Sequence, residues 1–270
     1  APVEAIRIDS TQNVGIGTSS PAARMDIHMS DSNGVYGRGK DGNLNLANTN
    51  TANTEGGWMS ISGYMNNPSN PIYEMAGITA KKSTAAGDGN YGGDLSFWTT
   101  SGGGNGEANS GMYQRMTIDR SGYVTKPNQP AFKAGRSSNI STSGGANIIF
   151  NDTSGNHFNQ GNHYNTTNGR FTAPVAGTYI FSAVVIFMNI ADGFGMDDAF
   201  YLYKNTTNVA YSFKRAEYVS GTTGNGGYYV DHVNVMLQLA ANDYVQIRNK
   251  TTLTVHGNTN YTFFYGYLLG

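Results

Sequence analysis

Hydrophobic and polar residues alternate with a period of two in several short segments of this chain. Such alternation occurs at residues 43–46, 94–99 and 178–183. A period of two places every second side chain on the same face of a β-strand. Gly, Pro, Asn and Ser separate these segments, and these residue types favour turns. The pattern therefore predicts an all-β chain built from short strands.

Composition supports the same fold class. The 270 residues include 36 glycines and 7 prolines, and charged residues make up only 13%, about half the usual share. The formal net charge of -1 offers no basic surface for nucleic acid. No apolar run reaches the roughly 18 to 20 residues that span a bilayer. We therefore expect neither nucleic-acid binding nor membrane insertion. The chain has no cysteine, so cysteine usage leaves the redox compartment open.

Residues 158–181 combine aromatic positions with turn residues. Pro174 fixes its φ angle and Gly177 permits positive φ, so the segment reads as short strands joined by turns. The order of residues resembles the signature of the complement C1q globular-head family. The matching residues are Phe158, Asn159, Tyr164, Gly169, Phe171, Ala173, Pro174, Gly177, Tyr179 and Phe181.

Further C1q-like motifs follow in the expected order. Asn242 stands where the family usually has glycine, and asparagine also tolerates the left-handed conformation of such a turn. The resemblance covers about residues 130–270. It implies a ten-stranded antiparallel jelly roll of the tumour-necrosis-factor type, whose known members assemble as trimers. The further matches are Leu202, Lys204, Asn205, Leu237, Leu239, Asp243, Val245 and residues 263–269.

The first half of the chain contains an internal echo. Residues 5–14 and 114–124 share an alternating strand, a polar turn and the start of a second strand, which predicts the same hairpin twice. Residues 14–27 and 114–122 also resemble phrases that recur in bacteriophage tail fibres. The expected domains are 1–13, the end of a preceding fibre module or an attachment segment; 14–126, an antiparallel β fibre module; 127–130, a linker; and 131–270, a C1q-like head.

The sequence gives little support for a catalytic site or a metal site. Polysaccharide cleavage needs two carboxylates roughly 5 to 10 Å apart, but the adjacent Asp197 and Asp198 would point to opposite faces of a strand. The spacing of His157 and His163 matches no recognised metal motif. We expect no catalytic residue, no metal and no cofactor. A calcium-binding loop with Asp192, Asp197 and Asp198 is the alternative to an ordinary polar loop.

Tyrosines in the second half of the head are the best candidates for ligand recognition. Tyrosine combines apolar area with a hydroxyl, which suits contact surfaces for carbohydrate or protein. A core or subunit-interface position is the alternative for each tyrosine. Loops 189–197 and 220–227 are the favoured binding segments, because function concentrates on loops held by a rigid scaffold. The candidate binding residues are Asp192, Asp197, Asp198, Tyr201, Tyr203, Tyr218, Tyr228 and Tyr229.

The leading hypothesis is a homotrimeric phage tail fibre on the virion surface. Its N-terminal part would contact other virion proteins, and its head would bind a host-surface glycan or protein. One alternative is a structural capsid-decoration or tail-collar fibre whose head only clamps a trimer. Two others are a depolymerase tailspike, disfavoured by the lack of a suitable carboxylate pair, and a secreted C1q-like lectin, disfavoured by the phage-like phrases.

Overall fold

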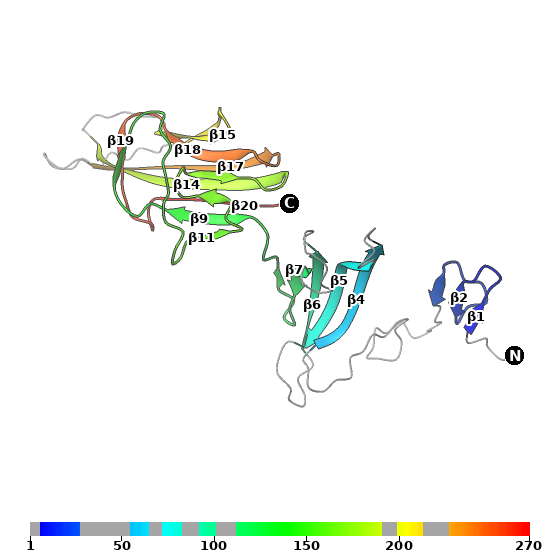
Figure 1. Cartoon of the computed structure of the whole chain (residues 1–270). Helices are drawn as coiled ribbons and strands as arrows, with labels where there is room; N and C mark the ends of the chain where they lie inside the picture. The colour runs from blue at the N-terminus through cyan, green and yellow to red at the C-terminus, as the bar shows by residue number, and fades with distance from the viewer. Residues whose placement is uncertain are drawn as a thin grey trace. The chain divides into compact units, whose positions relative to one another are not determined.

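The structure is a computed structural model that describes residues 6–27, 55–64, 72–82, 92–100, 112–190, 199–212 and 227–270 (Figure 1). The chain divides into two compact units, Ala1–Lys126 and Pro127–Gly270. All regular structure in the described residues is β-strand, which confirms the predicted all-β class. No helix in this part of the chain is long and apolar enough to cross a membrane.

The first unit contains two sheets among its described residues. The first has the order β1-β2-β3 and the second the order β4-β5-β6-β7-β8. The pairing of β1 with β2 joins residues on both sides of the boundary expected after residue 13. The strands are β1 (Ile6–Ile8), β2 (Val14–Ile16), β3 (Met25–Ile27), β4 (Glu55–Tyr64), β5 (Ile72–Lys82), β6 (Gly93–Thr100), β7 (Met112–Ile118) and β8 (Val124–Thr125).

The prediction of a wholly antiparallel first module is wrong at one pair. β2 and β3 are parallel, with Val14 opposite Met25 and Ile16 opposite Ile27. The connection that returns the chain to the same end of the sheet contains Gly17, which has a φ of 73°. Arg24 accepts a backbone hydrogen bond from Val14 N at 2.9 Å and so helps to align the returning strand.

The β1–β2 hairpin closes around the side chain of Asp9. Asp9 Oδ1 accepts hydrogen bonds from the N–H groups of Thr11 and Asn13, both at 2.9 Å. Its backbone carbonyl accepts a third from Gln12 N at 3.0 Å, and Gln12 has the left-handed φ of 67°. The hydrogen bond from Asn13 is the largest cause of the lowered pKa of Asp9.

The β7–β8 hairpin repeats this turn 110 positions later. Asp119 Oδ1 accepts from Ser121 N at 2.8 Å and from Tyr123 N at 2.9 Å. The carbonyl of Asp119 accepts from Gly122 N at 2.9 Å, and Gly122 has a φ of 85°. The same pattern of three hydrogen bonds therefore confirms the two predicted hairpins, with Gln12 adopting the conformation that glycine provides in the second copy.

The head, from residue 127 to 270, consists of two sheets (Figure 1). The larger has the order β10-β19-β14-β20-β9-β11, with β17 also paired to β14, and the smaller has the order β12-β13-β18-β15-β16. The strands are β9 (Ala131–Gly135), β10 (Ile140–Thr142), β11 (Phe158–Gln160), β12 (Tyr164–Asn165), β13 (Arg170–Thr172), β14 (Gly177–Ile190), β15 (Phe200–Lys204), β16 (Thr207–Tyr211), β17 (Gly227–Leu239), β18 (Tyr244–Asn249), β19 (Leu253–Val255) and β20 (Phe263–Leu268).

The described head has twelve strands, where the family resemblance implied ten. β10 and β19 pair with each other, from Ile140 opposite Val255 to Thr142 opposite Leu253. β19 also pairs with β14 through Phe187, so the two short strands extend the larger sheet. Buried Val255 and Leu253 pack in the hydrophobic core, which accounts for their ordering into a strand.

Aromatic rings from both sheets fill the core between them. Phe171 on β13 stacks on Phe132 with ring centroids 5.1 Å apart, and it meets Tyr179 and Phe181 edge to face at 5.6 and 5.5 Å. Phe264 on β20 contacts Phe132 edge to face at 4.9 Å. Offset and edge-to-face pairs are worth about 0.5 to 1.5 kcal/mol beyond the burial of their area. The contacts of Phe171 join the smaller sheet to the larger one.

The C1q-like signature residues serve this core and its turns. Asn159 and Tyr164 exchange two hydrogen bonds: Asn159 Nδ2 donates to the Tyr164 carbonyl at 2.7 Å, and Tyr164 N donates to Asn159 Oδ1 at 3.0 Å. The Tyr164 hydroxyl accepts from Phe150 N at 3.2 Å, while its ring stacks on Phe132 at 4.6 Å. Gly169 has a φ of 73° at the turn between β12 and β13.

We expect Gly266→Ala to destabilise the head. A Cβ at Gly266 would meet the Phe181 ring, lying 2.7 Å from Cε1, so the core would have to shift. Overpacking of this kind costs about 1 to 3 kcal/mol in the free energy of unfolding. Denaturant unfolding of the full chain measures it. Gly270→Ala is the matched control, because a Cβ there meets nothing within 4 Å. Equal unfolding midpoints for the two variants would contradict this account.

Candidate functional site

One face of the smaller sheet points away from the core and carries aromatic and basic side chains. Along β15 and β18, Leu202, Val245 and Ile247 are buried in the core, so the residues that alternate with them face outward. We call the outward surface the tyrosine–arginine face. Its members are Arg170, Tyr201, Tyr203, Tyr211, Tyr244 and Arg248.

The strand register places these side chains next to one another. Tyr201 lies opposite Arg248 on β18 and opposite Tyr211 on β16. Tyr203 lies opposite Gln246, which in turn lies opposite Arg170 on β13. Residues far apart in the sequence thus form two neighbouring rows across the sheet.

Each basic side chain on or beside this face lies over a tyrosine ring. The distance from guanidinium carbon to ring centroid is 4.2 Å for Arg170 over Tyr244 and 4.7 Å for Arg248 over Tyr203. Lys250 Nζ lies 6.0 Å from the centroid of Tyr201. Such contacts contribute about 0.5 to 1 kcal/mol at exposed sites. They also hold the cations close to the sheet surface.

The two arginines are further fixed by hydrogen bonds. Arg170 Nε donates to Gln246 Oε1 at 2.8 Å, and Asn147 Nδ2 donates to the same oxygen at 3.1 Å. Gln246 is only 3% exposed, so this acceptor is held rigidly. Arg248 Nε donates to the Gly145 carbonyl at 2.8 Å, and Arg248 Nη2 donates to the same carbonyl. The face is therefore organised before any ligand arrives.

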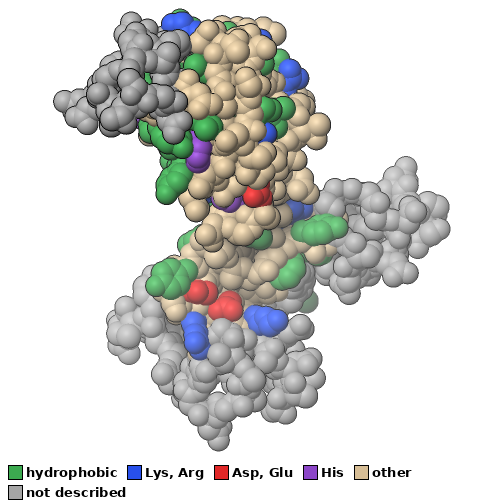
Figure 2. All heavy atoms as spheres, turned by 90° about the vertical axis from the view of Figure 1, so that its left-hand side faces the viewer, with side chains coloured by type: hydrophobic (Ala, Val, Ile, Leu, Met, Phe, Trp, Pro, Cys, Tyr) green, Lys and Arg blue, Asp and Glu red, His purple; other side chains and the backbone are tan. Residues whose placement is uncertain are grey.

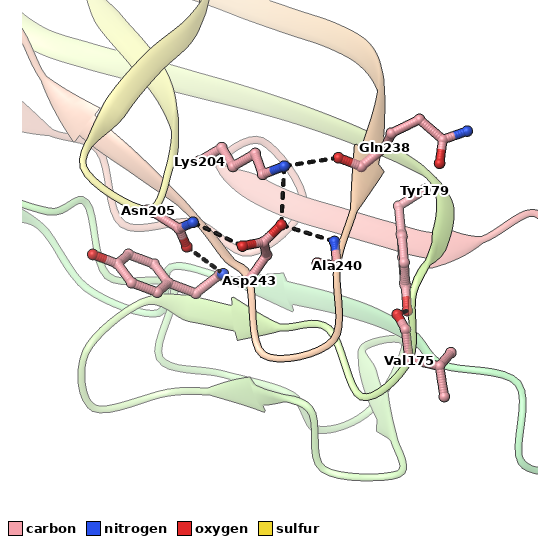
Figure 3. A network of polar contacts seen from close by, with 8 residues as sticks. Val175, Tyr179, Lys204, Asn205, Gln238, Ala240 and Asp243 are labelled. Atoms are coloured by element: carbon pink, nitrogen blue, oxygen red, sulfur yellow. Dashed lines mark hydrogen bonds and ion pairs between the residues drawn. The ribbon is translucent and has the colours of Figure 1, made fainter.

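A carboxylate network lies at the ends of strands β15 and β18 of the smaller sheet (Figure 3). Asp243 Oδ1 accepts from Asn205 Nδ2 at 2.8 Å, and its Oδ2 accepts from Ala240 N at 2.8 Å. Lys204 Nζ pairs with Oδ2 at 2.9 Å and also donates to the Gln238 carbonyl. The hydrogen bonds from Asn205 and then Lys204 lower the pKa of Asp243 to about 2.

This network joins two of the C1q-like motifs, which are nearly 40 residues apart. Asn205 Oδ1 accepts from Tyr244 N at 3.0 Å, so the Asn205 side chain bridges two turns. Asn205 and Asn242 have φ angles of 54° and 71°, which confirms that Asn242 replaces the family glycine without loss of the turn. Figure 3 also shows Tyr179, whose hydroxyl donates to the Val175 carbonyl at 2.8 Å.

A second carboxylate, Asp231 on β17, is wholly buried. Its Oδ2 accepts from the Ser212 hydroxyl and from Ala199 N at 3.0 Å, and its Oδ1 accepts from His232 N at 2.9 Å. Burial is the main cause of the raised pKa of Asp231. Ala199 directly follows residues 191–198, and Ser212 directly precedes residues 213–226. These hydrogen bonds therefore fix the strand ends that border both segments.

The structure separates the predicted tyrosine cluster. Tyr201 and Tyr203 share the tyrosine–arginine face, whereas Tyr228 and Tyr229 belong to β17 of the larger sheet. The Tyr229 ring lies 6.1 Å from that of core residue Phe187, and Tyr228 is 63% exposed. Among the described residues, no group of three or more His, Asp or Glu side chains could hold a metal. The predicted residues Asp192, Asp197, Asp198 and Tyr218 lie outside the described residues.

Sequence reasoning missed Arg170, Tyr244 and Arg248. The alternating order Tyr244, Gln246, Arg248 was a usable signal, since a strand with a polar residue at every second position has one solvent-facing side. Arg170 gave no comparable signal, because its place depends on pairing with a strand about 75 residues later. Figure 2 shows that Lys, Arg, Asp and Glu side chains cover only a small part of the face in view.

We expect Asp243→Asn to lower the free energy of unfolding at pH 7 by on the order of 1 kcal/mol, because a partly exposed ion pair is screened by solvent. The folded pKa of about 2 lies below the ordinary 3.8. The stabilisation is therefore present above pH 4 and is lost as the pH falls from about 4 towards 2. Denaturant unfolding from pH 2 to 7 measures it, and a variant that matches the wild type throughout would refute the role of the network.

Asp231→Asn should show the opposite pH dependence. The raised folded pKa means that the contribution of Asp231 to stability is fully present below the ordinary pKa of 3.8 and declines as the pH rises through the folded value. The stability advantage of the wild type over Asp231→Asn should thus be largest near pH 4 and shrink towards neutrality. The same unfolding series tests this, with Asp243→Asn as the control of opposite sign; an advantage that grows with pH would contradict it.

Comparison with solved structures finds matches at low sequence identity. Eiger TNF from S. frugiperda is 12% identical with a TM-score of 0.41, over 53% of this chain and 94% of that chain. The globular domain of the zebrafish complement 1qA protein is 18% identical with a TM-score of 0.37, over 53% and 98%. Murine APRIL is 9% identical with a TM-score of 0.39, over 52% and 99%. No curated protein matches this chain.

A sequence profile gives the stronger result. The profile of the C1q domain matches residues 131–269, slightly more than half of the chain and nearly all of the head. The matched region contains the buried aromatic signature, the Asp243 network and the closing strand β20. The chain therefore belongs to the C1q domain family.

Proposed function

We propose that this chain is a homotrimeric, non-catalytic fibre protein of a bacteriophage virion, whose C1q domain binds a ligand on the host cell surface. The tyrosine–arginine face carries this proposal, because it is an ordered aromatic and basic surface that the core does not use. The phage assignment rests on the tail-fibre phrases at residues 14–27 and 114–122. In this proposal other virion proteins bind the N-terminal part.

The outward side of the larger sheet supports self-association. We call it the apolar face. In one row across it, Ile180 lies between Met236 and Tyr267, and in another Val184 lies between His232 and Phe263. Met236 is 59% exposed and Tyr267 is 40% exposed. A contiguous apolar surface of this kind is characteristic of a subunit interface, and a cyclic trimer buries it.

Trimerisation would also strengthen weak ligand contacts. Three linked heads present three copies of the tyrosine–arginine face, and avidity can then exceed single-site affinity by roughly a hundredfold or more. Aromatic and arginine side chains are the types enriched at recognition surfaces. The proposed ligand is a cell-surface glycan or glycoprotein, with calcium needed only if Asp192, Asp197 and Asp198 form a site.

A structural fibre, on the capsid or tail collar, is the second candidate function. It is favoured by the position of the C1q signature residues, because Phe171, Tyr179 and Phe181 lie in the core and Asn159 orders a turn. Those residues specify the fold and not a ligand site. In this alternative the apolar face makes the head a trimerisation clamp, and the tyrosine–arginine face is an ordinary sheet surface.

One experiment on the purified full chain distinguishes the two candidate functions. We expect a solution mass of three times 28.9 kDa and retention on intact candidate host cells, with and without EDTA. Val184→Glu, which places a charge in the apolar face, should lower the mass. A stable trimer that is retained on no cells would favour the structural fibre. Release of reducing ends from host polysaccharide would instead indicate a depolymerase and contradict both.

A further inference from the structure

We propose that the tyrosine–arginine face binds acidic polysaccharide, with carboxylates on the arginines and sugar rings against the tyrosines. This inference rests on the proposed function and gives it a ligand class. The first observation in its favour is the positive charge of this face. Arg170 and Arg248 lie on the face and Lys250 lies beside it, so three cations are grouped on one side of a single sheet.

No described carboxylate of the head pairs with Arg170 or Arg248. Asp243 is paired with Lys204 at the ends of strands β18 and β15, and Asp231 is buried on β17. Asp152 belongs to a turn next to β9, where Ser154 N donates to its Oδ1 at 2.8 Å. In the described part of the head, the positive charge of the two arginines is therefore left for a ligand to meet.

The arginines keep hydrogen-bond donors for that ligand. Within the residues that the structure describes, Arg170 uses Nε for Gln246, and its two Nη groups meet no protein acceptor. Arg248 uses Nε and Nη2 for Gly145, and its Nη1 meets none. A guanidinium donates hydrogen bonds in its own plane and can bind a carboxylate through two parallel hydrogen bonds. A tyrosine ring packed against its flat side leaves these in-plane donors accessible.

The spacing of the cations suits a polymer. Arg170 lies opposite Gln246, so Arg248 is its diagonal neighbour on the adjacent antiparallel strand. Diagonal neighbours lie about 7 to 8 Å apart on adjacent strands, so the two arginines start from neighbouring positions of the sheet. One polysaccharide chain with repeated carboxylates could therefore contact both arginines.

The aromatic side chains favour a glycan over a peptide. Tyr201 meets Tyr211 edge to face at 5.2 Å and lies 6.3 Å from Tyr203, so three rings form a continuous surface. Tyr211 is 64% exposed and presents both ring and hydroxyl. Such rings pack against the apolar faces of sugars while hydroxyls and guanidinium groups meet polar atoms.

The test measures binding of the full chain to immobilised alginate and polysialic acid, with dextran as the neutral glycan and polyglutamate as the acidic peptide. EDTA is present throughout, so calcium bridging is excluded. We expect binding to alginate or polysialic acid, weakened by salt, and little binding to dextran or polyglutamate. The preferred probe distinguishes a uronate ligand from a sialate ligand.

Substitutions locate the site. Arg170→Gln and Arg248→Gln should each weaken binding about tenfold, which corresponds to the loss of one charge-assisted contact. Lys133→Gln is the matched control: Lys133 also lies over an aromatic ring, 5.1 Å from Phe263, but on the larger sheet. Its affinity should stay unchanged. The solution mass and unfolding midpoint of each variant show whether it folds and assembles as the wild type does. If loss of the Gly145 contact destabilises Arg248→Gln, Arg170→Gln still tests the site.

Four outcomes would overturn the inference. They are equal binding to dextran, equal binding to polyglutamate, equal weakening by Lys133→Gln, and cell binding that the arginine variants leave unchanged. Cell binding that the arginine variants leave unchanged would keep the proposed function but place the ligand-binding site elsewhere on the protein. Absence of binding to cells and to every glycan would instead overturn the proposed function together with this inference.

Discussion

The head depends on the packing of one group of aromatic rings between its two sheets. Phe171 is the central member, because it comes from the smaller sheet and contacts Phe132, Tyr179 and Phe181 of the larger one. Full burial of a phenylalanine contributes about 1.5 to 3 kcal/mol, and each side chain here is almost inaccessible to water. Close packing of rings also leaves no room for a side chain at Gly266.

Because one face of every central strand is committed to this core, the opposite faces are free to differ. On the larger sheet the outward residues are mainly apolar and uncharged, as at Ile180 and Val184. On the smaller sheet they are tyrosines and arginines, as at Tyr203 and Arg248. The same period of two that builds the core thus separates a surface suited to self-association from one suited to a polar ligand.

Sequence reasoning succeeded where local chemistry decides the structure. The Asp9 and Asp119 turns depend on hydrogen bonds within five residues, and Asn242 needs only its own left-handed conformation. It failed where distant segments pair. The added β10–β19 pair depends on long-range register, and so does the meeting of Arg170 with Gln246. The parallel β2–β3 pair is more local, 11 residues apart, and was missed because the alternation of a strand does not reveal its direction. The tyrosines looked like one cluster because they are close in sequence, and closeness in sequence does not show that their strands belong to different sheets.

The hydrogen bonds of Asp231 have a consequence for how this domain can diversify. Ala199 directly precedes β15, Ser212 directly follows β16 and Asp231 lies on β17; their contacts require no side chain from residues 191–198 or 213–226. One end of each connecting segment is thus anchored independently of the rest of the segment. Substitutions and insertions in such segments are tolerated when the bordering backbone is already satisfied. The head can therefore act as a fixed frame for two exchangeable segments, a property useful for changing specificity by evolution or by design.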